Sequence, residues 1–125
     1  MNGATMRGTA AAVIGTIVLA GSSARAHHGY ANFLINQIVS IEGDIEELRY
    51  ANPHIVLKIR TADSTVYTVT WESPKQVERA GVKRTTLKVG DHVIVTGAPP
   101  RDPASLEVMP VREIRRPRDG WKWHG

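Results

Sequence analysis

The sequence contains no cysteine, so neither a disulfide nor a thiolate metal site can form within the chain. Any metal site must therefore be built from histidine, carboxylate, methionine or backbone groups. Aromatic residues are also scarce, at 6% of the 125 residues, which leaves few platforms on which nucleotide bases could stack. Without disulfides, a domain of this size must be stabilised by burial of apolar side chains and by a hydrogen-bonded sheet.

The sequence also lacks the motifs of the common catalytic centres. It has no Ser-His-Asp order, no glycine-rich phosphate loop and no paired histidine–glutamate metalloprotease motif. Glu46 and Glu47 are adjacent, but neighbours on a strand face opposite sides, which argues against a shared acid–base role. We therefore assign no catalytic residues and predict a binding or accessory domain rather than an enzyme.

Acidic residues are absent from residues 1–26, which have the composition of a secretory signal peptide. Arg7 precedes the apolar run Thr9–Gly21, and the small residues Ala24 and Ala26 follow it. The run is shorter than the roughly 20 residues that span a bilayer, so we expect cleavage before His27 rather than an uncleaved anchor. This predicts a periplasmic or secreted protein without a transmembrane segment after cleavage.

Removal of the leader lowers the net charge. The full chain carries +4, and the leader takes Arg7 and Arg25 with it, which leaves +2 for the mature chain. A nucleic-acid-binding domain would be expected to keep a concentrated basic face, so nucleic acid is not the expected partner. We expect a periplasmic protein or a small ligand instead.

Residues 27–115 are predicted to form one small β domain, and residues 116–125 a polar C-terminal tail. Apolar and polar residues alternate along five segments, as they do in half-buried strands. The apolar parity shifts near Glu46 and Glu47, which predicts a β-bulge in the first strand. The predicted strands are Val39–Tyr50, His54–Arg60, Thr65–Glu72, His92–Gly97 and Ser105–Arg115.

One short helix is predicted between the third and fourth strands. Ser73 is a typical N-cap, Pro74 suits the first helical position, and Gln76 can complete a capping box. Gly81 is expected to end the helix as its C′ residue. Three strands, a short helix and two strands is the element order of the OB-fold, so we predict an all-β, five-stranded OB-like barrel. A small open β-sandwich is the alternative.

Two short motifs give the chain a family resemblance. His27-His28-Gly29-Tyr30 begins the expected mature chain, and Asn52-Pro53-His54 follows the first predicted strand. With these motifs the chain resembles a family of small exported bacterial proteins known only as a domain of unknown function. The resemblance covers most of residues 27–115 and implies an OB-like periplasmic domain, but no established activity. Three later segments also resemble the family: Ser73-Pro74, Leu87–Asp91 and Val93–Gly97.

The candidate metal site consists of His27, His28 and His54. Cleavage before His27 would free its α-amine, so that amine and imidazole together could chelate Cu(II), which favours nitrogen ligands. His54 is the expected third ligand because Pro53 stiffens its approach. His28 is a reserve ligand, since neighbours in an extended chain point apart. The alternative is a solvated terminus and a hydrogen-bonded histidine at a strand edge.

These observations predict a periplasmic binding or accessory domain that binds copper through an N-terminal histidine. One alternative is an OB-fold module that binds an oligosaccharide or another ligand. The other is a copper-dependent oxidative enzyme that uses the same histidines. Met109 is interpreted as core filling rather than as a copper ligand, and His92 as a half-exposed structural histidine.

Overall fold

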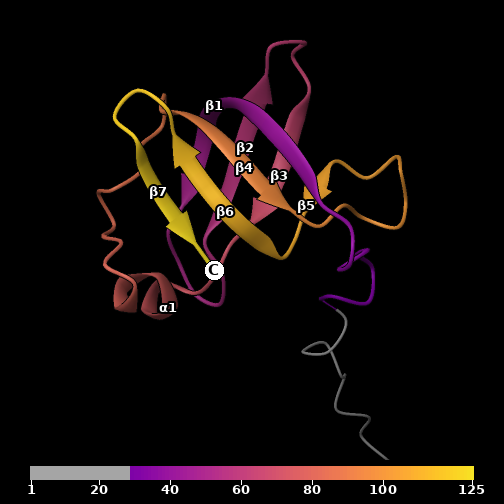
Figure 1. Cartoon of the computed structure of the whole chain (residues 1–125), viewed down its shortest axis with the longest axis horizontal. Helices are drawn as coiled ribbons and strands as arrows, with labels where there is room; N and C mark the ends of the chain where they lie inside the picture. Colours follow the sequence, from indigo (N-terminus) through magenta and orange to yellow (C-terminus); the bar gives the residue numbers. More distant parts are fainter. Residues whose placement is uncertain (1–28) are drawn as a thin grey trace, which may run out of the picture.

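The structure, a computed structural model, describes residues 29–125. Over these residues the chain forms seven strands and one short helix, which confirms the predicted all-β class with one helix (Figure 1). The strands build a single sheet in the order β5-β3-β2-β1-β4-β6-β7. The elements are β1 (Val39–Arg49), β2 (Val56–Thr61), β3 (Val66–Thr70), α1 (Pro74–Arg79), β4 (His92–Gly97), β5 (Glu107–Val108), β6 (Val111–Arg116) and β7 (Trp121–His124).

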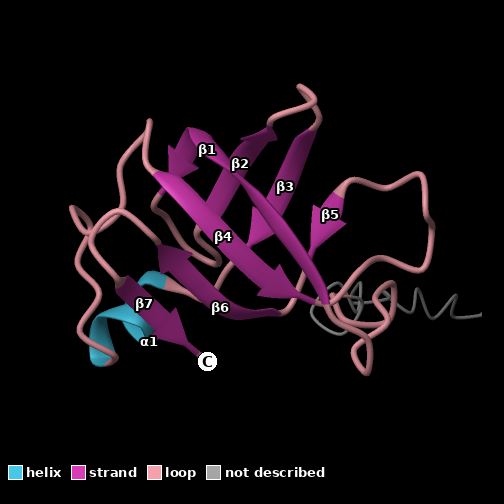
Figure 2. Ribbon diagram, turned by 45° about the horizontal axis from the view of Figure 1, so that its top comes forward, coloured by secondary structure: helices cyan, strands magenta, loops and turns pink. Residues whose placement is uncertain are grey.

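The predicted fifth strand is divided in two, because Pro110 has no N–H to donate to a ladder. β5 pairs in parallel with β3, whereas β6, two residues further on, pairs antiparallel with β4. One stretch of chain therefore lies against both flanks of the β3-β2-β1-β4 ladder. Within the described residues the hydrogen-bonded ladder does not close, so the sheet is curved but open (Figure 2). The open sheet is consistent with the open-sandwich alternative, whereas the predicted closed barrel of five strands is not formed among residues 29–125, where the sheet has seven strands.

The C-terminal residues form a strand where the sequence predicts a polar tail. β7 pairs antiparallel with β6 after a turn at Gly120, whose φ is +73°. Trp123 of β7 is buried and lies against Trp71, with ring centroids 5.1 Å apart in an edge-to-face arrangement. Residues 116–125 contain too few apolar residues for the sequence to predict a strand there. The strand forms because Trp123 is buried against the distant indole of Trp71.

The bend of β1 agrees with the sequence prediction. The register of β1 against β2 shifts between Ile45 and Glu47, which confirms the predicted β-bulge. Gly43 lies just before it, and a Cβ there would overlap with the backbone oxygen of Arg60 on β2. Glycine is therefore required at this position for the two strands to pair closely.

Helix α1 begins and ends as its sequence predicts. The Ser73 side chain accepts a hydrogen bond from the Gln76 N–H, and the Gln76 side chain accepts one from the Ser73 N–H, which completes the capping box. Gly81 follows the helix with φ +85°. Val77 is the buried residue of the helix. None of the helices among residues 29–125 has the length and apolar character needed to cross a membrane.

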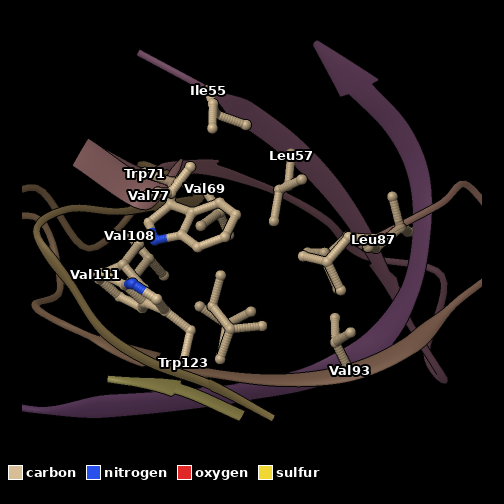
Figure 3. Close-up of a cluster of buried hydrophobic side chains, with 14 of the residues drawn as sticks. Ile55, Leu57, Val69, Trp71, Val77, Leu87, Val93, Val108, Val111 and Trp123 are labelled. Carbon is tan, nitrogen blue, oxygen red and sulfur yellow. The ribbon is translucent and has the colours of Figure 1, made fainter. Parts of the chain in front are cut away.

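The core lies inside the curved sheet. Trp71 and Trp123 lie beside Val108 and Val111 at one end of it (Figure 3). Alternation along the second and third predicted strands gives each an inward face, and the apolar residues on these faces are fully or almost fully buried, except for Tyr67, which is partly buried. The buried residues are Ile55, Leu57, Ile59, Val69 and Trp71.

Truncation of Leu57 to alanine should lower the free energy of unfolding by about 2–5 kcal/mol, because the side chain is fully buried and leaves a cavity. Lys58→Ala, on the opposite face of β2, should change it by no more than about 0.5 kcal/mol. Urea unfolding followed by tryptophan fluorescence measures both. Equal effects of the two substitutions would contradict this assignment of the strand faces.

Candidate functional site

His54 lies between the break after β1 and the start of β2. Its Nδ1 is 3.0 Å from the backbone oxygen of Trp71. A carbonyl oxygen only accepts hydrogen bonds, so Nδ1 must carry the hydrogen and donate it. In the neutral ring the other nitrogen, Nε2, then has a free lone pair with which it can bind a metal ion.

The carbonyl that orients His54 is held by an extension of the β2–β3 ladder. The N–H of Ile55 donates to the oxygen of Glu72 at 3.0 Å, and the N–H of Trp71 donates to the oxygen of Ile55 at 2.8 Å. Trp71 itself is only 3% exposed. The acceptor of His54 is thus part of the rigid sheet, which restricts the orientation of the imidazole ring.

His54 shares a small hollow with residues from two other parts of the chain. Tyr30 comes from the segment before β1, and Met109 from the break between β5 and β6. A Cβ placed on Gly29 would lie 3.2 Å from Cε of Met109, so the residue before Tyr30 also approaches this region. The lining residues are Tyr30, His54, Thr70, Trp71, Glu72, Met109, Pro110 and Val111.

Only one of the three predicted metal ligands belongs to the described part of the chain. His27 and His28 lie outside residues 29–125, and His54 is the member whose surroundings are known. Among residues 29–125, no group of three or more histidine and carboxylate side chains is arranged to hold a metal ion. The three-histidine site therefore stays a prediction.

The surroundings of Met109 differ from its interpretation as core filling. Val108 and Val111 on either side of it are buried in the core, whereas Met109 is only partly buried and lies on the wall of the hollow. The sequence carries a weak signal of this, since alternation along the strand places Met109 on the face opposite Val108.

A second polar cluster lies on the outer face of β1 and β4. The Nδ1 of His92 is 2.7 Å from a carboxylate oxygen of Asp44, and its Nε2 is 2.9 Å from one of Glu42. Both nitrogens can donate only when the ring is protonated. The contact with Glu42, and next the contact with Asp44, raise the pKa of His92 above 6.5.

The cluster was not predicted, although its signal is present in the sequence. His92 is half-exposed as expected, and its partners lie on the neighbouring strand β1. Glu42 and Asp44 share one face of β1, and Asp44 is directly opposite His92 in the β1–β4 register. The cluster can be found only once it is known that β1 pairs with β4, which is distant from it in the sequence.

A larger hollow lies elsewhere, between β1, β3 and the loop before β5. It has a volume of about 550 Å³, and its walls include Leu34, Ile41, Tyr67, Pro100 and Leu106. Tyr67 is the one aromatic residue among those that line this hollow, so the hollow offers a sugar a single stacking platform. The hollow gives the oligosaccharide alternative no specific support.

Comparison with known proteins adds a family but no activity. A family model described as a family of unknown function (DUF6152) matches residues 14–108. The matched region includes His27, His28 and His54, and it ends directly before Met109. No curated protein matches the chain.

The imidazole of His92 should titrate with a midpoint above 6.5 in an NMR pH titration, because two carboxylates stabilise its protonated form. Its contribution to stability is then present below pH 6.5 and is lost as the pH rises through the pKa of the folded state. Glu42→Gln should move the midpoint down toward 6.5. Glu47→Gln, which removes a carboxylate opposite β2 rather than β4, is the control. An unchanged midpoint in Glu42→Gln would refute this account.

Proposed function

Since the chain belongs to DUF6152, a family of unknown function, we propose its function from the candidate site itself. The protein is an exported domain whose mature chain begins at His27. It binds copper through the amine and imidazole of His27 and through Nε2 of His54. The proposed role is that of a binding or accessory protein in the periplasm. The small size of the hollow around His54 favours binding of an ion over binding of a substrate.

The observation that carries this proposal is the hydrogen bond from His54 Nδ1 to the Trp71 oxygen at 3.0 Å. Histidines that bind metals almost always donate their other ring N–H to a carbonyl, a carboxylate or water. Such a bond fixes the tautomer and makes the ligating nitrogen more basic. His54 therefore has the support that a metal ligand needs.

The connectivity of the chain supports His27 as its partner. Tyr30 lines the same hollow as His54 and follows His27 by three residues. Three residues of extended chain span at most about 10 Å, so the His27 nitrogens are tethered within reach of this hollow. A tether this short reduces the loss of chain entropy on metal binding.

The donor set favours Cu(II). The amine and the imidazole of His27 form one chelate ring, and His54 adds a third nitrogen. Among divalent first-row metals, copper binds such nitrogen ligands most tightly. His28 remains a reserve ligand, because it directly precedes Gly29 and its ring is expected to point away from that of His27.

Titration of Cu(II) against a competing chelator tests the proposal with three samples: the processed protein, His54→Ala, and a variant with one extra residue before His27. Loss of His54 should weaken affinity by about tenfold or more, since a ligand contributes at least as much as the groups that support it. The extension should weaken affinity to a similar extent, because it moves the amine away from the chelating imidazole.

Two controls accompany this titration. His92→Gln removes a half-exposed histidine on another face and should leave the affinity unchanged. N-terminal sequencing of the protein from its native envelope should begin at His27. Equal affinities in all three titrated samples would show that the histidines do not form the site, and a retained Met1 would rule out the amine chelate.

A further inference from the structure

We infer that the first residues of β1, Val39–Glu42, bind an extended peptide segment of a partner protein as an added strand. The segment is apolar on the face that it turns to the domain and carries a lysine or arginine at its N-terminal end. This binding site lies away from the hollow around His54, and the inference is independent of the proposed function.

The start of β1 has a free edge. The β1–β4 ladder begins at Val39, whereas the β1–β2 ladder begins at Gly43. Residues 39–42 therefore pair with β4 on one side and, among residues 29–125, with no strand on the other. A row of unpaired N–H and C=O groups is a template for pairing with another chain.

The direction of the backbone groups identifies those that an added strand can reach. The N–H of Ile45 donates to the oxygen of Asp91, and the oxygen of Ile45 accepts from the N–H of Gly90, so both groups face the β4 side. The β1–β4 register has no shift, and backbone directions alternate along an antiparallel ladder. The backbone groups of Ser40 and Glu42 therefore point away from β4, toward the free edge.

The 550 Å³ hollow lies along this edge (Figure 1, Figure 2). Three consecutive residues of β1, Val39–Ile41, line it. Successive side chains of a strand point to opposite faces, so a hollow lined by consecutive residues lies beside the backbone rather than over one face. Its opposite wall includes Tyr67 of β3 and residues 105–107. The free edge thus borders a space of the size that ligands occupy.

The loop between β4 and β5, which closes one end of the hollow, is fixed in place. The N–H of Leu34 donates to the oxygen of Pro99 at 2.9 Å. Arg101 donates from its N–H to the oxygen of Asn32 and from its side-chain Nε to the oxygen of Ala31, each at 2.8 Å. Because these bonds hold the wall before a partner arrives, little ordering of the domain opposes binding.

Apolar side chains dominate the wall and rim of the hollow. Leu34, Pro100 and Leu106 lie on the wall, and Leu106 is 42% exposed. Ile38, directly before β1, is 70% exposed. In strand addition the main chain supplies affinity, and pockets for alternate side chains supply specificity. These surroundings favour apolar side chains on the face of the added strand that is turned toward the hollow.

The far end of the edge is acidic. A second hollow, which shares part of its lining with the first, extends to Glu42 and Asp63, and among residues 29–125 no lysine or arginine lines it. Hydrogen bonds from the side chain of Thr61, and next from the N–H of Thr65, hold the pKa of Asp63 below its usual value. His92 contacts only Oε1 of Glu42, so the other oxygen can accept a further bond. Both carboxylates are thus placed to attract a basic side chain.

The outer edge of β7 is a less suitable template. Lys122 and His124 are exposed on it, and lysine on an edge strand is a common protection against added strands. Val39–Ile41 carry no charge, so the start of β1 lacks this protection. The two edges therefore provide a site and an internal control.

Antiparallel pairing, which β1 adopts with both of its neighbours, determines the expected peptide. The N-terminal end of an antiparallel strand lies near Glu42, where the basic residue belongs. Residues directly opposite each other share a face, so side chains on the face of Ile41 enter the hollow while their amides point away from β1. The amides of the alternate residues, which lie opposite Ser40, donate to β1.

The probe is an acetylated and amidated hexapeptide, Lys-Val-Ser-Val-Ser-Val, titrated into ¹⁵N-labelled processed protein. Saturable shifts of the Ser40 and Glu42 amides are expected. N-methylation of the two serine amides should weaken binding by about tenfold or more, because it removes main-chain donors. N-methylation of the first two valine amides, which point away from β1, is the matched control and should change the affinity by less than about threefold.

Two further changes test the charge and the edge. A glutamate in place of the peptide lysine should weaken binding by about threefold or more, since it meets the acidic end. Ser40→Pro removes the N–H that faces the added strand and should abolish binding. That N–H forms no bond to β4, so the amide spectrum of the variant should stay dispersed as in the folded wild type.

Four results would overturn the inference. They are equal affinities of the two N-methylated peptides, shifts confined to Trp121–His124 of β7, no saturable shift up to about 1 mM peptide, or concentration-dependent shifts of Ser40 without peptide. The last would assign the edge to a second copy of this chain. Vesicles of phosphatidylcholine and phosphatidylglycerol serve as a separate sample. If they broaden the Ile38 and Leu106 signals while the peptide does not bind, the surface belongs to a membrane and the inference fails.

Discussion

Trp71 connects the core of the domain to the candidate metal site. Its indole packs edge-to-face on Trp123, and its backbone oxygen orients His54. The indole N–H has no hydrogen-bond partner among residues 29–125. An unpaired buried donor is costly, so the packing of the two rings has to outweigh that cost. Substitutions of Trp123 should therefore disturb the orientation of His54 from across the core.

The opposite end of β4 is held by a different kind of interaction. Arg116 of β6 is buried, and it donates to a carboxylate oxygen of Asp91 at 2.8 Å and to the oxygen of Thr86 at 2.7 Å. Asp91 also accepts from the N–H of Lys88. Arg116 and Asp91 each have a further hydrogen-bond partner besides one another. These bonds offset the desolvation cost of burying the two charges. The pair joins the segment after α1 to the sheet, away from the hollow at Met109.

The sequence predicts those features whose causes are local. The capping residues around Ser73 determine where α1 starts, and the change of apolar parity in β1 reveals the bulge after Ile45. β7 and the partners of His92 were missed, because both depend on pairing between segments distant in the chain. Met109 was interpreted as core filling from its residue type, although alternation along the strand places it on the face opposite Val108, where the structure shows it partly buried.

The proposed site links metal binding to the processing of the chain. An α-amine at His27 would exist only after cleavage, so in this proposal the unprocessed precursor lacks the chelate while it already contains His54. The ring of His54 is oriented by its hydrogen bond to the backbone oxygen of Trp71. The folded domain would thus supply a preorganised half-site, and the released N-terminus would complete it. Under this proposal, copper binding through the amine would be confined to the mature protein, because only cleavage creates that ligand.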